Sequence, residues 1–179
     1  MGRATLAVLL CLLGCAAAGG TRKAGTMDET KVVMEPVTGV EDPGGDKDGV
    51  LKLKDGTSCT LGRQDKRFSV WLRILGSAQK SGMPVYVACA PGGAAQTILP
   101  MAARTIEQVG GVGTTAERTA VQIFMAPSIH FLTARHAALR PLLEEAVKTQ
   151  EPLLLAVEPG TLEILGARKP PEGLDVTPI

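Results

Sequence analysis

His130 and His136 are the only histidines among the 179 residues, and imidazole is the side chain that most readily ligates metals or transfers protons near neutral pH. Their separation of six residues does not place them on one helix face, where neighbours lie three or four residues apart. No cysteine or acidic residue stands beside them at a metal-ligand spacing. The sequence therefore predicts two ordinary imidazoles and no metal or other cofactor. A lipid-anchored hydrolase or metal-assisted enzyme that uses His130, His136 and a nearby carboxylate is the alternative.

Cys59 and Cys89 fall within the expected folded domain, thirty residues apart. In an oxidising compartment, a disulfide between them would stabilise the fold by roughly 3–4 kcal/mol. Both lie in expected strands, and pairing requires Cα atoms within about 7 Å of each other. Two buried free thiols are the favoured interpretation and a disulfide is the alternative. A redox site is not indicated, because the C-x-x-C spacing is absent.

Other sequence features that resemble catalytic motifs are incomplete. The glycine-rich segments at 92–93 and 110–113 are not followed by Gly-Lys-Ser/Thr, so turns explain them better than a phosphate-binding loop. Ser128 lacks the G-x-S-x-G context of a serine nucleophile. We therefore expect no catalytic residues and a non-enzymatic interaction or accessory domain.

An unusually apolar stretch follows the expected second hairpin and contains Phe124, Ile129, Phe131 and Leu132. Such a concentration most often contributes to the core. The alternative is a surface that binds a protein partner, because the run from Ile129 to Leu132 is too apolar for a plain loop.

The first twenty residues have the proportions of an export signal. Residues 4–14 are apolar apart from Thr5, which is too short for a membrane-spanning helix of about 20 residues. The residues Leu12-Leu13-Gly14-Cys15 resemble the lipobox of bacterial lipoprotein precursors. The resemblance implies a signal peptide of residues 1–14, a diacylglycerol group on the sulfur of Cys15, and a fatty acyl chain such as palmitate on its new amine. An ordinary secretory signal cleaved near Ala18 is the alternative.

The resemblance also predicts a location. Ala16 follows Cys15, so the aspartate that marks retention at the inner membrane is missing, which favours the outer membrane. The domain would then lie in the periplasm or at the cell surface, with an envelope protein as partner. A structural component of an envelope machine is a further alternative.

Net charge limits the partners. Removal of residues 1–14 takes away Arg3 alone, leaving 18 basic and 18 acidic side chains. A neutral chain lacks the basic surface that binds nucleic acid. It also lacks a polybasic membrane patch, so membrane attachment would have to be covalent or inserted.

The organisation predicted from composition is a flexible tether over residues 15–48, a globular domain over 49–167 and a tail over 168–179. Within the domain, Asp55-Gly56 joins two short strands as a hairpin. Apolar spacing from Phe68 to Ala78 predicts a first helix, with Asp65 able to cap it and Gly82 as its stop. A second helix is predicted over 137–149, and strands over 85–90, 120–125, 153–157 and 162–165. Residues 99–109 fit a helix or a strand, and we favour a strand.

A faint repeat relates the two helix–strand segments. Pro84, Pro91 and Gly92 match Pro152, Pro159 and Gly160 at a constant offset. The sequence therefore predicts a single α+β domain with a mostly antiparallel sheet, two amphipathic helices on one face, and two βαββ units. The alternative is that helix–Pro–strand–Pro-Gly is a common local pattern.

Overall fold

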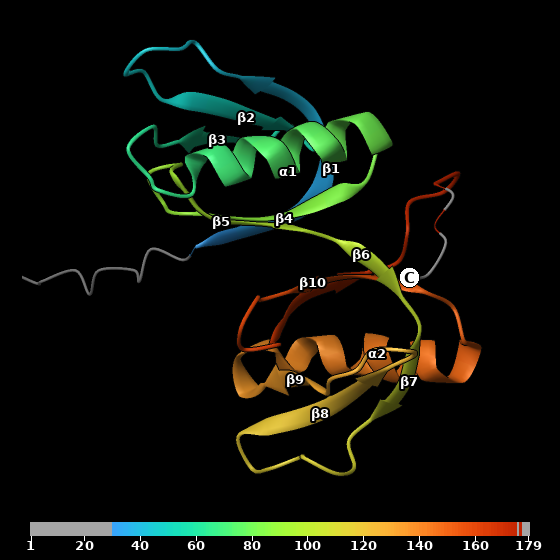
Figure 1. Ribbon diagram of the computed structural model, residues 1–179. Helices are drawn as coiled ribbons and strands as arrows, with labels where there is room; N and C mark the ends of the chain where they lie inside the picture. Colours follow the sequence, from blue (N-terminus) through green and yellow to red (C-terminus); the bar gives the residue numbers. More distant parts are fainter. Residues whose placement is uncertain (1–29, 175, 177–179) are drawn as a thin grey trace, which may run out of the picture.

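The computed structural model describes residues 30–174 and 176, which fold as two consecutive halves with the same order of elements (Figure 1). The first half runs strand–strand–strand–helix–strand–strand, and the second follows the same order with its first strand divided into two and a 3₁₀ helix before its α-helix. The elements of the first half are β1 (Lys31–Glu41), β2 (Gly49–Leu53), β3 (Ser58–Leu61), α1 (Phe68–Ser81), β4 (Pro84–Cys89) and β5 (Ala95–Pro100). Those of the second are β6 (Ala102–Arg104), β7 (Ile106–Val109), β8 (Arg118–Ile123), β9 (His130–Thr133), the 3₁₀ helix η1 (Ala134–Leu139), α2 (Arg140–Thr149), β10 (Leu153–Val157) and β11 (Ile164–Arg168).

Local chemistry accounts for the boundaries of several elements. In the β2–β3 turn, Gly56 adopts a positive φ of 85°, and the Asp55 carboxylate accepts a hydrogen bond of 2.9 Å from the Thr57 backbone N–H. Helix α1 ends at Gly82, whose φ of 70° is the left-handed conformation common after helices. Pro141 lies in the first turn of α2, where a missing N–H costs no helical hydrogen bond. The predicted hairpin, helices and buried strand β10 are confirmed.

The tether predicted over residues 15–48 is wrong from Lys31 onward. Strand β1 is the central strand of a five-stranded sheet with the order β3-β2-β1-β4-β5. Its first part pairs with β4 and its second part with β2, and a register shift between Val37 and Gly39 interrupts the pairing with β2. Val33 and Val37 point into the core, while polar neighbours and Pro36 give the segment the composition of a loop. Residues 16–29 lie outside the described part of the chain.

The second half repeats this sheet with one break. Strands β6 and β7 are separated by Thr105 alone; β6 pairs with β10, and β7 pairs with β8. Together they occupy the place of β1, so the order β9-β8-β7/β6-β10-β11 matches the first half. The sheet of each half also curls, so that its outer strand, β3 or β9, forms an isolated bridge with the residue that precedes the opposite edge strand. These bridges are Thr60–Ala94, before β5, and Phe131–Glu163, before β11. The predicted repeat therefore has a structural counterpart, with units of five strands and one helix instead of βαββ.

Three hydrophobic clusters show how the helices and sheets pack together. The first core packs α1 against one face of the first sheet, and the second core packs α2 inside the second half. The central core lies between the halves and contains Tyr86 and Ala88 of β4 with Leu154 and Ala156 of β10. Successive side chains of a strand point to opposite faces. Strands β4 and β10 therefore each pack against the helix of their own half with one face and against the other half of the molecule with the opposite face.

The α+β class with mostly antiparallel strands and two helices is confirmed. The two helices do not share one face of a common sheet, as the repeat had suggested, because each half has its own curled sheet and its own core (Figure 1). No helix within residues 30–174 is long and apolar enough to cross a membrane.

Contacts between the halves include the chain's C-terminal part. Arg168, expected in a tail, is the last residue of β11, and its Nη1 pairs with Glu35 Oε1 of β1 at 3.0 Å. The same guanidinium donates to the backbone oxygen of Met34. Leu174 and Val176 pack against the central core. The predicted domain boundary at residue 167 therefore falls within the folded structure.

Candidate functional site

A polar cleft of about 840 Å³ opens where the two halves meet. Strands β1, β4 and β5 form one wall, and the end of β9, η1 and the β10–β11 connection form the other. Its principal polar side chains are Tyr86 and Gln96 from the first half and Arg135, His136, Glu158 and Glu163 from the second. The volume lies within the range of about 300–1,000 Å³ typical of small-molecule sites.

His136 and Glu163 are paired in this cleft. Nδ1 of His136 lies 2.8 Å from Oε1 of Glu163, and the Thr133 hydroxyl donates to the same oxygen at 2.6 Å. A carboxylate only accepts hydrogen bonds, so the imidazole donates through Nδ1–H. Nε2 of His136 has no hydrogen-bond partner among the described residues. The pair therefore holds the imidazole in one orientation and leaves its second nitrogen for a ligand.

Glu163 is held ionised by its neighbours. Partial burial acts to raise the pKa of its carboxyl group, but hydrogen bonds from Thr133 and His136 outweigh this effect. The positive charges of His136 and Arg135 lower the pKa further, so the net shift is downward from 4.5. The carboxylate stays charged at neutral pH and remains an acceptor.

We expect Glu163→Gln to lower the free energy of unfolding by about 1–2 kcal/mol at neutral pH, because it removes charge-assisted hydrogen bonds. A lowered pKa in the folded state stabilises the protein above the unfolded value and loses that contribution as pH falls. The difference between wild type and variant should therefore shrink below about pH 4.5, the ordinary value. Urea titrations at several pH values measure this difference in the free energy of unfolding. Glu107→Gln, at an exposed position of β7, is the control; an equal, pH-independent loss in both variants would contradict the role of the pair.

Tyr86 joins the cleft to the central core. Its ring packs against Gly166 of β11, since a Cβ built on that glycine would lie 2.9 Å from Tyr86 Cδ2. Burial raises the pKa of the Tyr86 hydroxyl, Arg135 lowers it, and Glu163 and Glu158 raise it. The hydroxyl therefore stays neutral and able to donate a hydrogen bond. Its position is fixed because the Tyr86 ring that carries it is packed in the central core.

His130 lies apart from this pair. Its Nδ1 is buried without a hydrogen-bond partner in the described residues. Burial lowers the pKa of the imidazole, a hydrogen bond with the Ser128 backbone opposes this shift, and the charge of Arg104 adds to it. His130 of β9 pairs with Val121 of β8. This is the position that Cys59 of β3 occupies in the first half, where it pairs with Leu51 of β2. The two histidines do not converge, and the described residues hold no group of three His, Cys, Asp or Glu side chains able to bind a metal.

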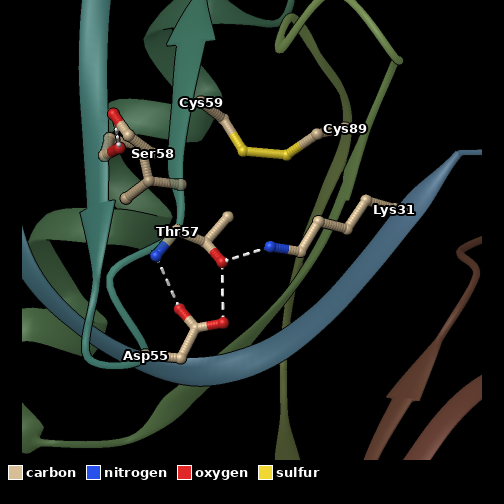
Figure 2. The surroundings of a disulfide bond; sticks show 7 residues. Lys31, Asp55, Thr57, Ser58, Cys59 and Cys89 are labelled. Atoms are coloured by element: carbon tan, nitrogen blue, oxygen red, sulfur yellow. Dashed lines mark hydrogen bonds between the residues drawn. A yellow bond between two sulfur atoms is a disulfide. The ribbon is translucent and has the colours of Figure 1, made fainter.

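Cys59 and Cys89 form a disulfide in the first half (Figure 2). Their Cα atoms are 6.4 Å apart, within the range of natural disulfides. Strands β3 and β4 are not neighbours in the sheet, so the bond links its curled edge to its centre beside the Thr60–Ala94 bridge. The interpretation favoured from the sequence, two buried free thiols, is therefore wrong, and the alternative, a disulfide, is present. Both cysteines are buried, which makes the bond structural.

The predicted partner surface is divided by the fold. Phe124 is 51% exposed and Ile129 is 39% exposed, both at the β8–β9 connection. Phe131 is half-buried, with the Arg118 guanidinium 3.9 Å above its ring. Leu132 is buried in the second core and cannot contact a partner, because β9 alternates between an outer and an inner face.

Sequence reasoning identified His136 but none of its companions in the cleft. Tyr86, Gln96, Glu158 and Glu163 stand on segments far apart in the chain, and no spacing rule relates them. One signal was available: Glu158 and Glu163 flank the Pro-Gly turn of the second half.

The chain matches no protein-family model, no curated protein and no solved structure.

Proposed function

We propose that this chain is an exported, lipid-anchored envelope protein whose α+β domain binds a small polar ligand without catalysis. The observation that carries the binding function is the cleft between the halves. Among the described residues, no hydrogen-bond partner is found for His136 Nε2, the Tyr86 hydroxyl or the Arg135 guanidinium, and all three residues line this cleft. Polar groups that converge in a cleft and remain unpaired are available to a ligand.

Export is supported by the disulfide. Such bonds persist in oxidising compartments and are rare in the reducing cytosol. Cys15, the proposed lipid-bearing residue, lies outside the described residues, so its assignment rests on the lipobox resemblance. By that resemblance the protein is attached to the outer membrane, with the domain in the periplasm or at the cell surface.

The anchor is tested by metabolic labelling with a fatty acid in a bacterium that processes lipoproteins. We expect labelled wild-type protein in the membrane fraction, and unlabelled Cys15→Ser protein, because serine has no thiol to accept the diacylglyceryl group. Cys11→Ser is the matched control and should remain labelled. Label retained by Cys15→Ser would show that the fatty acid is attached elsewhere, and an unlabelled wild type would show that the chain carries no such anchor.

An enzyme is the second candidate, favoured by the His136–Glu163 pair. An imidazole oriented by a carboxylate is an arrangement suited to a general base. The described lining of the cleft contains no Ser, Cys or Lys, and activation of water by His136 is the reaction that this pair would support most directly. The fate of the ligand distinguishes the binding protein from the enzyme. A binding protein releases its ligand unchanged, whereas hydrolysis of the ligand that is abolished by His136→Gln would overturn the non-enzymatic proposal.

A protein contact in the envelope is compatible with ligand binding. Phe124 and Ile129 remain the accessible members of the predicted partner surface. Crosslinking in intact envelopes followed by purification would identify such a partner, and with it any role as a structural component of an envelope machine. Loss of the crosslink in Phe124→Ser would place the contact at this connection.

A further inference from the structure

We infer that the second half is closed by a reversible latch, in which Glu163 holds Thr133 and His136, and that acidification releases it. At the corresponding place the first half is closed by the disulfide between Cys59 and Cys89. The latch belongs to the fold and would open and close whatever ligand the cleft binds.

The two halves close their curled sheets at joints that match in their backbone contacts. The Phe131 N–H donates to the backbone oxygen of Leu162 at 3.0 Å, as the Thr60 N–H does to that of Gly93 at 2.8 Å. Phe131 and Thr60 also form the two isolated bridges between the outer strands and the opposite edges. The two joints can therefore be compared position by position.

The disulfide has no covalent counterpart at the second joint. Cys59 and His130 each directly precede the bridging residue of the outer strand. Cys89 of β4 and Val157 of β10 each pair with the residue that directly follows the bridging residue at the opposite edge. His130 and Val157 therefore occupy the places of the two cysteines, and their side chains cannot form a disulfide.

Glu163 fastens the second joint instead. Its backbone bridges Phe131, and its carboxylate accepts hydrogen bonds from Thr133 at 2.6 Å and from His136 at 2.8 Å. The first half has Ala94 at this position, whose methyl group offers no such bond. Hydrogen bonds break and form again without a chemical reaction, so the second joint can open reversibly, whereas full opening of the first requires reduction of its disulfide.

His130 makes the second joint sensitive to acid. Its Nδ1 is buried with no hydrogen-bond partner among the described residues, so a protonated ring would hold a buried donor without an acceptor. Burial and the charge of Arg104 outweigh the Ser128 backbone and lower the pKa of His130 from 6.5. The opened joint, where water reaches the ring, therefore binds a proton more readily than the closed joint. Opening is favoured as pH falls through 6.5.

The other charged groups around the joint leave this response to His130. His136 donates through Nδ1–H whether it is neutral or protonated, so its bond to Glu163 persists. The charges of His136 and Arg135 help to lower the pKa of Glu163 from 4.5, so the carboxylate is neutralised only at lower pH. Arg118 on β8 keeps its charge throughout. Glu158 bonds within its own connection and does not hold the joint closed.

Hydrogen exchange of the full chain, followed by mass spectrometry, tests the latch. Protection of residues 130–139 is compared with that of β3 at about pH 7.5 and about pH 5.5, after correction for the pH dependence of exchange in an unfolded chain. Protection of residues 130–139 should fall up to about tenfold more than that of β3, because the lower pH is about one unit below the ordinary value for His130. Unchanged relative protection would overturn the acid response.

Two substitutions assign the response to His130. Neither His130→Leu nor His130→Gln can gain a proton, so relative protection should be the same at both pH values. The glutamine variant keeps a polar side chain and serves where leucine disturbs the fold. A wild-type response in either folded variant would overturn the role of His130.

Two further variants test the latch and the match between the joints. Glu163→Gln should lower protection of residues 130–139 about fivefold at neutral pH, because it removes charge-assisted hydrogen bonds, whereas Glu107→Gln on β7 should not. His130→Cys with Val157→Cys should form a second disulfide on oxidation and abolish the pH dependence. Normal protection in Glu163→Gln would overturn the latch, and failure of the two new cysteines to join would overturn the correspondence with the first half.

Discussion

Replacement of Gly166 by valine is expected to lower the free energy of unfolding by about 3 kcal/mol, because it forces apart the two halves. A Cβ on Gly166 would lie 2.6 Å from Met34 Sδ and 2.9 Å from Tyr86 Cδ2. The thioether of Met34 can move, but the ring of Tyr86 is held in the central core. Chemical denaturation followed by circular dichroism measures the loss.

Two further variants make this prediction specific. Gly76→Ala is the control: a Cβ added to this glycine of α1 would meet no atom within 4 Å, so alanine should stabilise the helix slightly. Met34→Ala combined with Gly166→Ala should recover part of the loss of Gly166→Ala alone, because the two side chains compete for one space. Full additivity of the two substitutions, or an unchanged midpoint in Gly166→Val, would contradict close packing of the halves.

Removal of the disulfide by Cys59→Ala with Cys89→Ala is expected to lower the free energy of unfolding by about 3–4 kcal/mol. The bond closes a loop with a sequence separation of 30 residues, so its loss increases the entropy of the unfolded chain. It also frees β3, the outer strand of the first sheet, to separate from β4. Urea denaturation measures the change.

A reducing agent supplies the matched control. Dithiothreitol should bring the wild type to the stability of the double variant and leave the variant itself unchanged. Hydrogen exchange should show the loss of protection concentrated in the first half, above all in β3, because the second half has no such bond among its described residues. Free thiols detected by mass in the exported wild type would refute the bond.

Local signals in the sequence predicted most of the secondary structure. The Asp55-Gly56 turn, the helical stop at Gly82 and the apolar run of β10 each depend on neighbouring residues, and all three occur as predicted. Strand β1 was missed because its stability comes from two partners, β4 and β2, that follow it in the chain. A central strand with polar neighbours and Pro36 has the composition of a loop until those partners are known.

The site was predictable only in part. His136 was named because histidine is rare in this chain, but nothing local associates it with Glu163, which lies 27 residues away, beyond helix α2 and strand β10. Tyr86 gave no signal of its own, because it belongs to the central core and lines the cleft at the same time. His130, paired with His136 in the enzyme hypothesis, lies at the position that Cys59 occupies in the other half.

The sequence by itself determined the alternation of helix and strand, the repeated Pro and Gly positions, and the lipobox-like residues around Cys15, since each depends on contacts or recognition over a few neighbours. The tertiary structure decided how the two halves meet. Packing of β4 against β10 across the central core brings Tyr86 to Arg135, His136 and Glu163, and the curl of the first sheet brings Cys59 to Cys89. These pairings depend on the curl and stacking of whole sheets, which distant residues determine together.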